Sequence, residues 1–541
     1  MNAPMPSYEQ AYAQFKWAVP STFNFGADVV DRWADDPRRL ALIWENAAGE
    51  TRRLTYREIA LLTNRVANAL AKLGVVKGDR IIIMMPRIPE WQIALVAALK
   101  LGAVPIPCIE MLTARDLEYR IDNSGAKAVV CRAIQTPKFA GVLDKLTARV
   151  AIGAAPGWHD FNTIAGQASD VFKAPVVNAE DPAIIYYTSG STGHPKGVTH
   201  ASRALYSWRF AAINWLDLHD GDRIWCTADT GWSKAGTSVL FGPWSQGACS
   251  IFYDGPFDPR QRLALIEKHK VNVYCAPGTE LFRVVDEDFG AFDLSALRRT
   301  VSAGEVVHAA VAQRWKAVTG MDVCIAYGLT ELLMTTVSYP GHRVKPGSMG
   351  LSAPGSVMDI VDHDGRRLPD GVEGHVAMLA PNPQIMLGYW RDPERSERCY
   401  VDGPGGRWFI TGDTGTRDAD GYFSYIGRSD DVINSAGYRI GPLEVENALL
   451  EHPSVQECAV VPSPDTERGE IVKAFVVLRP GYAGDAELIR QLQDHVKVIT
   501  APYKYPRAIE FLDTLPKTMT GKILRRDLRN RENSKAKSKA P

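Results

Sequence analysis

Short apolar runs alternate with amphipathic stretches along the first two thirds of the chain. R-I-I-I-M-M-P (80–86) predicts a buried strand, and P-E-W-Q-I-A-L-V-A-A-L-K (89–100) predicts a buried helix. The same pattern predicts strands at 126–131, 223–228, 247–253, 271–276, 298–304 and 321–327, and helices at 258–270 and 308–318. Continuous apolar strands that alternate with helices are typical of a parallel sheet covered on both faces. We therefore expect an α/β fold.

The pattern changes twice further along the chain. After about residue 345 Gly and Pro become frequent, and V-D-H-D-G-R-R-L and R-D-A-D-G-Y-F-S-Y predict hairpins that turn at Asp-Gly. After residue 430 the sequence predicts a helix that begins at Pro442, strands at 455–461 and 471–478, a helix at 484–498 and a strand at 507–512. We expect a large N-terminal domain (1–429) with a small β-barrel-like region. A smaller, mobile α+β C-terminal domain (430–541) follows, with a disordered basic tail from about 531.

Composition narrows the function without identifying it. With 541 residues, 45% hydrophobic and 23% charged, the chain has the composition of a globular protein of more than one domain. The 62 basic and 62 acidic residues give no overall field to attract nucleic acid or an anionic membrane, so local donors must hold any anionic ligand.

No apolar run reaches the roughly 20 residues of a membrane span. The N-terminus has no signal-peptide pattern. The eight cysteines show neither C-x-x-C nor zinc spacing. We expect a cytoplasmic protein with buried, reduced cysteines and no nucleic-acid partner. The oligomeric state is left open, with a homodimer as one option.

The clearest local motif is I-I-Y-Y-T-S-G-S-T-G-H-P-K-G-V, residues 184–198. An apolar strand enters a loop whose glycines let backbone N–H groups approach an anion, and whose hydroxyls and Lys196 add donors. The loop is not a P-loop, because Pro195 stands where the second glycine of that pattern is required. The chemistry suits a polyphosphate; a plain Gly/Ser turn between two strands is the structural alternative.

This loop, T-S-G-S-T-G-H-P-K-G, resembles the signature loop of the adenylate-forming superfamily of acyl-CoA synthetases, luciferases and nonribosomal adenylation domains. The resemblance extends from L-T-Y-R-E-I (54–59) to P-K-T-M-T-G-K-I-L-R-R (516–526), and T-A-P-Y-K-Y-P-R (500–507) is most similar to the medium-chain acyl-CoA synthetases. It implies a ligase that uses ATP, Mg²⁺ and coenzyme A. Such an enzyme converts a medium-chain, branched or aromatic acid to acyl-AMP, releases pyrophosphate and transfers the acyl group to coenzyme A. The alternatives are delivery to a carrier-protein thiol or to oxygen, and a nucleotide-binding scaffold without chemistry.

The resemblance also implies the ATP site. Tyr327 would stack near adenine, Thr330 would contact the α-phosphate, Glu331 would hold Mg²⁺, and Asp413 and Arg428 would bind the ribose. The implied catalytic residues are Lys522 (the adenylation lysine), Lys196, Thr330, Glu331 and Arg439. The other implied nucleotide contacts are Thr188, Ser189, Gly190, Ser191, Thr192, Gly193, Gly304, Glu305, Gly328 and Leu329. Taken alone, V-S-A-G-E-V (301–306) is an ordinary strand-to-helix turn, Glu331 a helix N-terminal charge and Lys522 a solvated lysine.

Coenzyme A and the acid have implied sites as well. Asp430 would be the hinge of the C-terminal domain. Coenzyme A would contact Ala436, Gly437, Tyr438, Arg468 and Lys497. In the acyl pocket Trp232 would form a wall, with core packing as its alternative, and the small Gly236 and Gly278 would leave room for a chain or ring. Glu110 falls near the substrate where the family suggests Gln, so its carboxylate would repel an acid or select one with a polar group.

Overall fold

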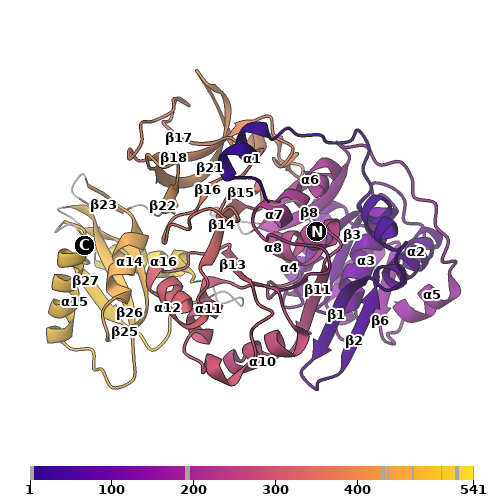
Figure 1. The fold of residues 1–541 in the computed structure, drawn as a ribbon, viewed down its shortest axis with the longest axis horizontal. Coiled ribbons are helices and arrows are strands. Elements are labelled where there is room, and N and C mark those ends of the chain that lie inside the picture. The colour runs from indigo at the N-terminus through magenta and orange to yellow at the C-terminus, as the bar shows by residue number, and fades with distance from the viewer. Residues whose placement is uncertain are drawn as a thin grey trace.

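The computed structural model describes residues 5–188, 195–428, 431, 433–435, 438–465, 468–500, 503–517 and 523–539, with only the backbone for 434, 438, 439, 469 and 536–539. Figure 1 shows an elongated molecule in which the C-terminal module lies at one end and the N-terminal strands of residues 40–55 lie toward the other. The predicted α/β class is confirmed.

A nine-stranded sheet runs through the middle of the molecule. Its order is β16-β15-β14-β13-β12-β10-β11-β1-β2. The parallel strands are β1 (Leu40–Asn46), β10 (Arg223–Cys226), β11 (Cys249–Asp254), β12 (Val273–Cys275), β13 (Arg299–Ala303) and β14 (Val323–Leu329). The antiparallel edges are β2 (Thr51–Thr55), β15 (Leu333–Val337) and β16 (Leu351–Ser352). Each strand predicted in this region is therefore present.

A second, wholly parallel sheet lies between β2 and β10 in the chain. It contains β4 (Val104–Cys108), β3 (Arg80–Met84), β5 (Ala128–Arg132), β6 (Ala148–Ile152) and β7 (His159–Asp160), in that order. Helix α3 (Pro89–Lys100) has the predicted bounds, and every residue but Glu90 is buried. A helix that is apolar all round must be covered on all sides, which explains its place in the main core.

Helices cover the two sheets. The predicted helices are α10 (Pro259–His269) and α12 (Ala309–Thr319). The others in this part are α1 (Tyr8–Gln14), α2 (Tyr56–Lys72), α4 (Ala114–Ser124), α5 (Phe161–Gln167), α6 (Ser202–Ser207), α7 (Arg209–Asn214), α8 (Ser233–Ala235), α9 (Gly242–Ser245), α11 (Gly278–Val284) and α13 (Pro393–Glu397). None of the helices in the described ranges has the length and apolar character that crossing a bilayer requires. All eight cysteines are free, and all but Cys399 are buried, as expected.

The Gly- and Pro-rich region is antiparallel, as predicted. Its five strands are β17 (Met358–Val361), β18 (Gly374–Ala380), β20 (Tyr400–Gly403), β21 (Gly406–Arg417) and β22 (Phe423–Arg428). The turn after Arg417 closes as Asp418 N–H donates to the Tyr422 carbonyl, at the predicted Asp-Gly hairpin. A small sheet, β19 (Gly388–Tyr389), β9 (Lys196–Ala201) and β8 (Pro182–Thr188), connects this region to the phosphate loop.

The C-terminal module has its own core. Its sheet contains β23 (Ile433–Ser435), β24 (Tyr438–Ile440), β25 (Val455–Asp465), β26 (Gly469–Leu478) and β27 (Ala508–Phe511), and its helices are α14 (Pro442–Leu450), α15 (Ala486–Ile499) and α16 (Arg525–Lys539). The predicted disordered tail from residue 531 is wrong as far as Lys539, because α16 continues to that residue. Glu532 anchors it: its carboxylate lies 2.9 Å from Lys473 Nζ and accepts a hydrogen bond from Ser463.

Candidate active site

Lys196, Tyr389 and Glu331 form one hydrogen-bonded cluster where the phosphate loop ends. Lys196 Nζ lies 2.8 Å from Glu331 Oε1 and donates to Tyr389 Oη at 2.6 Å, while Tyr389 donates to Glu331 Oε1 at 2.9 Å. The strand pairing explains the meeting. Tyr389 of β19 stands opposite Val198 of β9, and Lys196 lies two residues before Val198 on the same face.

Burial and charge fix the protonation of this cluster. Glu331 is 8% exposed. Burial alone would raise the pKa of Glu331, but Lys196 and the hydrogen bonds from Lys196 and Tyr389 outweigh it, so the pKa lies below its usual range. Burial and the neighbouring Glu331 raise the pKa of Tyr389, which keeps its proton. The site thus holds an ammonium, a carboxylate and a neutral phenol. Next to it, the buried hydroxyl of Thr188 has no hydrogen-bond partner in the described part of the chain.

Asp413 joins Tyr327 to Arg428. Asp413 of β21 and Arg428 of β22 are directly opposed in the antiparallel ladder, and Arg428 donates to Asp413 Oδ1 at 3.0 Å. Tyr327 donates to Asp413 Oδ2 at 2.6 Å. The carboxylate is 2% exposed, and burial together with Asp413 raises the pKa of Tyr327. These three residues, predicted from separate motifs, therefore meet in one place.

Two residues hold Thr330, which follows β14. His200 Nε2 lies 2.6 Å from the Thr330 carbonyl, and Ser233 Oγ lies 3.3 Å from Thr330 Oγ1. Burial lowers the pKa of His200 to about 4, so at neutral pH its uncharged ring donates to that carbonyl. Glycine is required at 328, because a Cβ there would overlap the Leu333 carbonyl across the hairpin. Tyr327, Gly328 and Leu329 lie within β14 rather than after it.

The predicted adenine segment begins where β13 ends at Ala303. Gly304 has φ +88°, a conformation that favours glycine. The carboxylate of Glu305 accepts a hydrogen bond from the Thr279 N–H at 2.5 Å, in the first turn of α11. In this structure Glu305 therefore caps a neighbouring helix.

The residues expected in the acyl pocket differ in their surroundings: Trp232 is exposed, whereas Gly236 and Gly278 are closely packed. Trp232 is 41% exposed, so it is not a core residue. A Cβ at Gly236 would overlap the Tyr186 hydroxyl, and one at Gly278 would overlap the Val306 carbonyl. Close packing explains both glycines, and the room expected beside them is occupied by protein atoms.

Glu110 is already paired. Arg132 Nε donates to Glu110 Oε1 at 2.6 Å, and the other guanidinium nitrogen binds Oε2. The Glu110 carbonyl also accepts from Lys138 Nζ at 2.5 Å. Arg132 neutralises the carboxylate that was expected to repel or select substrates.

Several predicted residues lie outside the described part of the chain. They are Ser189, Gly190, Ser191, Thr192, Gly193, Asp430, Ala436, Gly437 and Lys522, together with the side chains of Tyr438 and Arg439. The two remaining coenzyme A candidates are not joined by any contact in the described ranges. Arg468 N–H donates to Asp465 at 2.9 Å, and Lys497 pairs with Asp494 at 2.8 Å on α15.

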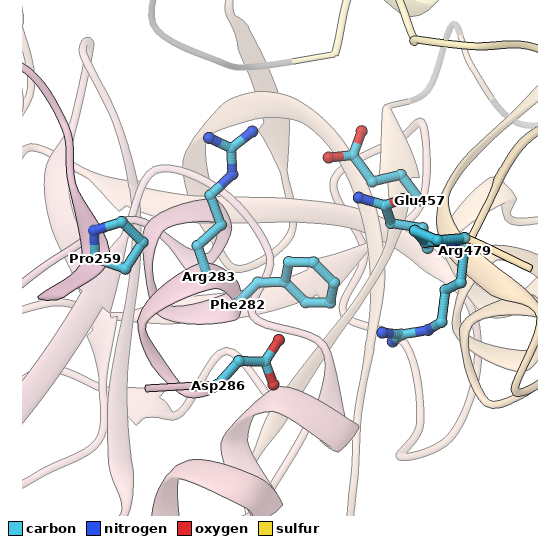
Figure 2. A pocket seen from close by; sticks show the side chains of 8 residues that line it. Pro259, Phe282, Arg283, Asp286, Glu457 and Arg479 are labelled. Carbon is cyan, nitrogen blue, oxygen red and sulfur yellow. The ribbon is translucent and has the colours of Figure 1, made fainter. Parts of the chain in front are cut away.

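The C-terminal module contacts the rest of the chain near helices α10, α11 and α12. The His308 ring lies 2.6 Å from the Asn447 side-chain oxygen of α14. Figure 2 shows a cleft in which Phe282 and Arg283 of α11 lie across from Glu457 of β25 and Arg479, which follows β26.

Sequence reasoning missed Tyr389 and His200, and it placed the segment of Ser233 (229–237) only in the acyl pocket. No local motif marks Tyr389 or His200, because each reaches the site through strand pairing or a contact with a segment distant in the chain.

Comparison with known proteins identifies the class. A model of AMP-binding enzymes matches residues 30–390, and one of the AMP-binding enzyme C-terminal domain matches residues 444–522. The mitochondrial acyl-coenzyme A synthetase ACSM3 of Homo sapiens is 40% identical over 97% of this chain and 92% of its own length. The uncharacterized acyl-CoA ligase YtcI of Bacillus subtilis is 40% identical over 96% and 98%.

Solved structures agree. The anthranilate CoA ligase AuaEII in complex with anthranoyl-AMP superposes with a TM-score of 0.87 at 32% identity, covering 96% of this chain and 98% of that one. A benzoate CoA ligase from Burkholderia xenovorans LB400 gives 0.83 at 28%, covering 94% and 100%. The chain belongs to the AMP-binding enzymes. Within them it is an AMP-forming acyl-CoA synthetase, which makes an acyl-adenylate from ATP and then transfers the acyl group to coenzyme A.

Proposed function

We propose that this enzyme activates a medium-chain, branched or aromatic carboxylic acid, with the Lys196–Tyr389–Glu331 cluster as its triphosphate site. The cluster carries the proposal, since a half-buried lysine at the end of a glycine-rich loop suits phosphate oxygens. Relatives whose names include benzoate and anthranilate support an aromatic acid, and the medium-chain resemblance supports an aliphatic one.

In the first step a carboxylate oxygen attacks the α-phosphorus and pyrophosphate leaves. Negative charge builds on the phosphoryl oxygens, so positioning and fixed positive groups supply most of the catalysis. Lys196 and the loop amides of 189–193 would hold the β- and γ-phosphates. Thr330 would contact the α-phosphate, and Lys522 would supply charge where the carboxylate attacks.

The residues present fit Mg²⁺. Glu331 is an ionised, buried carboxylate, which is the oxygen ligand a hard cation prefers. No cluster of three or more potential protein ligands lies in the described ranges, so phosphate oxygens and water would complete the coordination. Bound Mg²⁺ would neutralise charge on the phosphates.

A second group of residues would orient the nucleoside. Asp413 would accept hydrogen bonds from the ribose hydroxyls and Arg428 would add a contact, while Tyr327 would stack near adenine, with Gly304, Glu305, Gly328 and Leu329 bordering it. The network among Tyr327, Asp413 and Arg428 supports this role, because it holds the carboxylate in one orientation.

In the second step the thiol of coenzyme A attacks the acyl carbon and AMP leaves. Lys522 would have to withdraw, so the C-terminal module would rotate about Asp430 and bring 436–438 and Arg439 to the site. Arg468 and Lys497 would bind the coenzyme A phosphates. Both residues are half-buried, which leaves part of each side chain at the surface and supports binding there.

The test is a screen of acids of two to twelve carbons and aromatic acids, with AMP and free thiol followed together. The proposal expects AMP formation to depend on acid, ATP, Mg²⁺ and coenzyme A. Transfer to a carrier-protein thiol in place of coenzyme A would contradict it. A cytoplasmic location and a homodimer stay predictions, to be checked by cell fractionation and light scattering.

A further inference from the structure

Lys234 lies beside the proposed reaction centre and has no role in the chemistry above. Lys234 is the second residue of α8, which begins directly after Trp232. The first residue of this helix, Ser233, contacts Thr330. Lys234 Nζ donates to the Ala303 carbonyl at 2.9 Å, and its Cδ lies 3.9 Å from where a Cβ of Gly304 would stand. The side chain therefore sits between the segment proposed for the acyl pocket and the one proposed for adenine.

The half-buried ammonium of Lys234 has no carboxylate ion pair in the described part of the chain. Within the described ranges no carboxylate oxygen lies within 4.0 Å of it. The two lysines that are buried in the described ranges differ: Lys100 pairs with Asp31 at 2.5 Å, and Lys473 pairs with Glu510 at 2.8 Å. A lysine that is partly withdrawn from water without an opposite charge is costly, so its remaining donors favour a partner.

The charge itself is retained. Burial lowers the pKa of Lys234, but Cys275, Cys226, Glu305 and Glu280 together outweigh burial, so the pKa lies above its usual range. An ammonium has three N–H donors, and the Ala303 carbonyl uses one. At neutral pH two charged donors are therefore left to face the half-buried surroundings of Lys234.

We propose that Lys234 is a specificity-determining residue that binds a hydrogen-bond acceptor on the acyl substrate, such as a hydroxyl, a carbonyl or a second carboxylate. This inference rests on the proposed function and narrows its substrate class to acids with a polar substituent. The acceptor would complete the hydrogen bonds of the ammonium, whereas a wholly apolar chain would leave it unpaired. A site built for a polar group rejects the analogue that lacks it. Glu110, the residue first expected to select polar acids, is already bound by Arg132.

A purely structural role for Lys234 is the competing explanation. Cys226 and Cys275 are opposed in the β10–β12 ladder. Burial raises the pKa of the Cys275 thiol, but the hydrogen bond with Cys226 and the charge of Lys234 outweigh it and bring the pKa to about 7. If Lys234 only balances a Cys275 thiolate, its loss would affect every acid alike.

The experiment compares matched acids on the full-length enzyme: 2-hydroxybenzoate with benzoate, and 5-oxohexanoate with 5-methylhexanoate. The wild type should have the higher kcat/KM for the acceptor-bearing acid of at least one pair. Lys234→Met should lower the ratio of the two kcat/KM values by about 10- to 100-fold, the loss expected for a charge-assisted hydrogen bond. Lys234→Arg, which keeps a charged donor, should retain part of the ratio. The control Lys268→Met, at an exposed lysine paired with Glu45, should leave the ratio unchanged.

The outcomes separate the explanations. An equal loss for both acids of each pair, or a wild type that prefers the apolar member of both pairs, overturns the assignment to Lys234. If no acid supports AMP formation at all, the proposed function fails first and this inference with it. If Lys234→Met does not fold, the wild-type ratios and Lys234→Gln decide the question.

Discussion

Lys196 and Glu331 lie 2.8 Å apart although they come from different sheets, one opening β9 and the other following β14. Lys196 helps to hold the pKa of Glu331 below its usual range, so the carboxylate keeps its charge in a place largely removed from water. Triphosphate oxygens would take over Lys196 and leave the carboxylate for the cation. The pair therefore has a role both before and after ATP binds.

Tyr389→Phe should lower kcat/KM for ATP by about 5- to 30-fold. The ring stays under the Lys196 ammonium, but the hydroxyl that joins Lys196 to Glu331 is lost, at a cost of about 1–2 kcal/mol. Pyrophosphate release against ATP concentration measures it. Tyr400→Phe, in the adjoining antiparallel sheet, should have little effect; equal kinetics for the two variants would contradict the role of Tyr389.

Asp413→Asn should raise KM for ATP at least about 10-fold, because an amide cannot accept from Tyr327 and Arg428 on both oxygens. KM for the acid should change much less. Steady-state kinetics with each substrate varied in turn separate the two. The matched control is Asp402→Asn, at an exposed aspartate of β20; a larger change in KM for the acid than for ATP would argue against a ribose contact.

The free energy of unfolding should decrease as the pH is lowered, because of His200. Its pKa is about 4 in the folded protein and about 6.5 unfolded. The unfolded chain therefore binds a proton first as pH falls. The stabilisation is complete above pH 6.5 and is lost toward pH 4, by up to about 3 kcal/mol. Denaturant unfolding at several pH values should show a shallower loss for His200→Gln. His363→Gln, at an exposed ring, should follow the wild type, and parallel curves for all three proteins would refute the buried, neutral ring.

Lys522→Ala should abolish adenylate formation yet largely keep thioester formation from premade acyl-adenylate. The reason is that only the first step needs positive charge where the carboxylate attacks phosphorus. Single-turnover assays of the two half-reactions measure this. Equal loss in both would mean that Lys522 supports folding or nucleotide binding instead.

Strands β10 to β14 of the large sheet could be predicted because they are short, mostly buried runs, as at 249–254, whereas β1, β2, β15 and β16 were not predicted. The hairpin at 417–425 could also be predicted, because of its Asp-Gly turn. Tyr389 was not, because its role depends on the pairing of β19 with β9. Gly236 and Gly278 misled for a related reason: a small residue leaves room for substrate or for a neighbouring protein atom, and only the packing decides. The tail was misjudged because Leu528, near the start of its helix, packs in an apolar cluster and the helix continues through ion pairs at Glu532, and neither contact can be seen in the tail sequence.

Exchange of labelled pyrophosphate into ATP, measured without coenzyme A, tests the account most directly, because reversible acyl-adenylate formation is the only step it requires. We expect exchange in the wild type that depends on an accepted acid and on Mg²⁺, and a loss of about 100-fold or more in Lys196→Met. Exchange that proceeds without any acid, or that survives the loss of Lys196, would contradict a triphosphate site at this cluster.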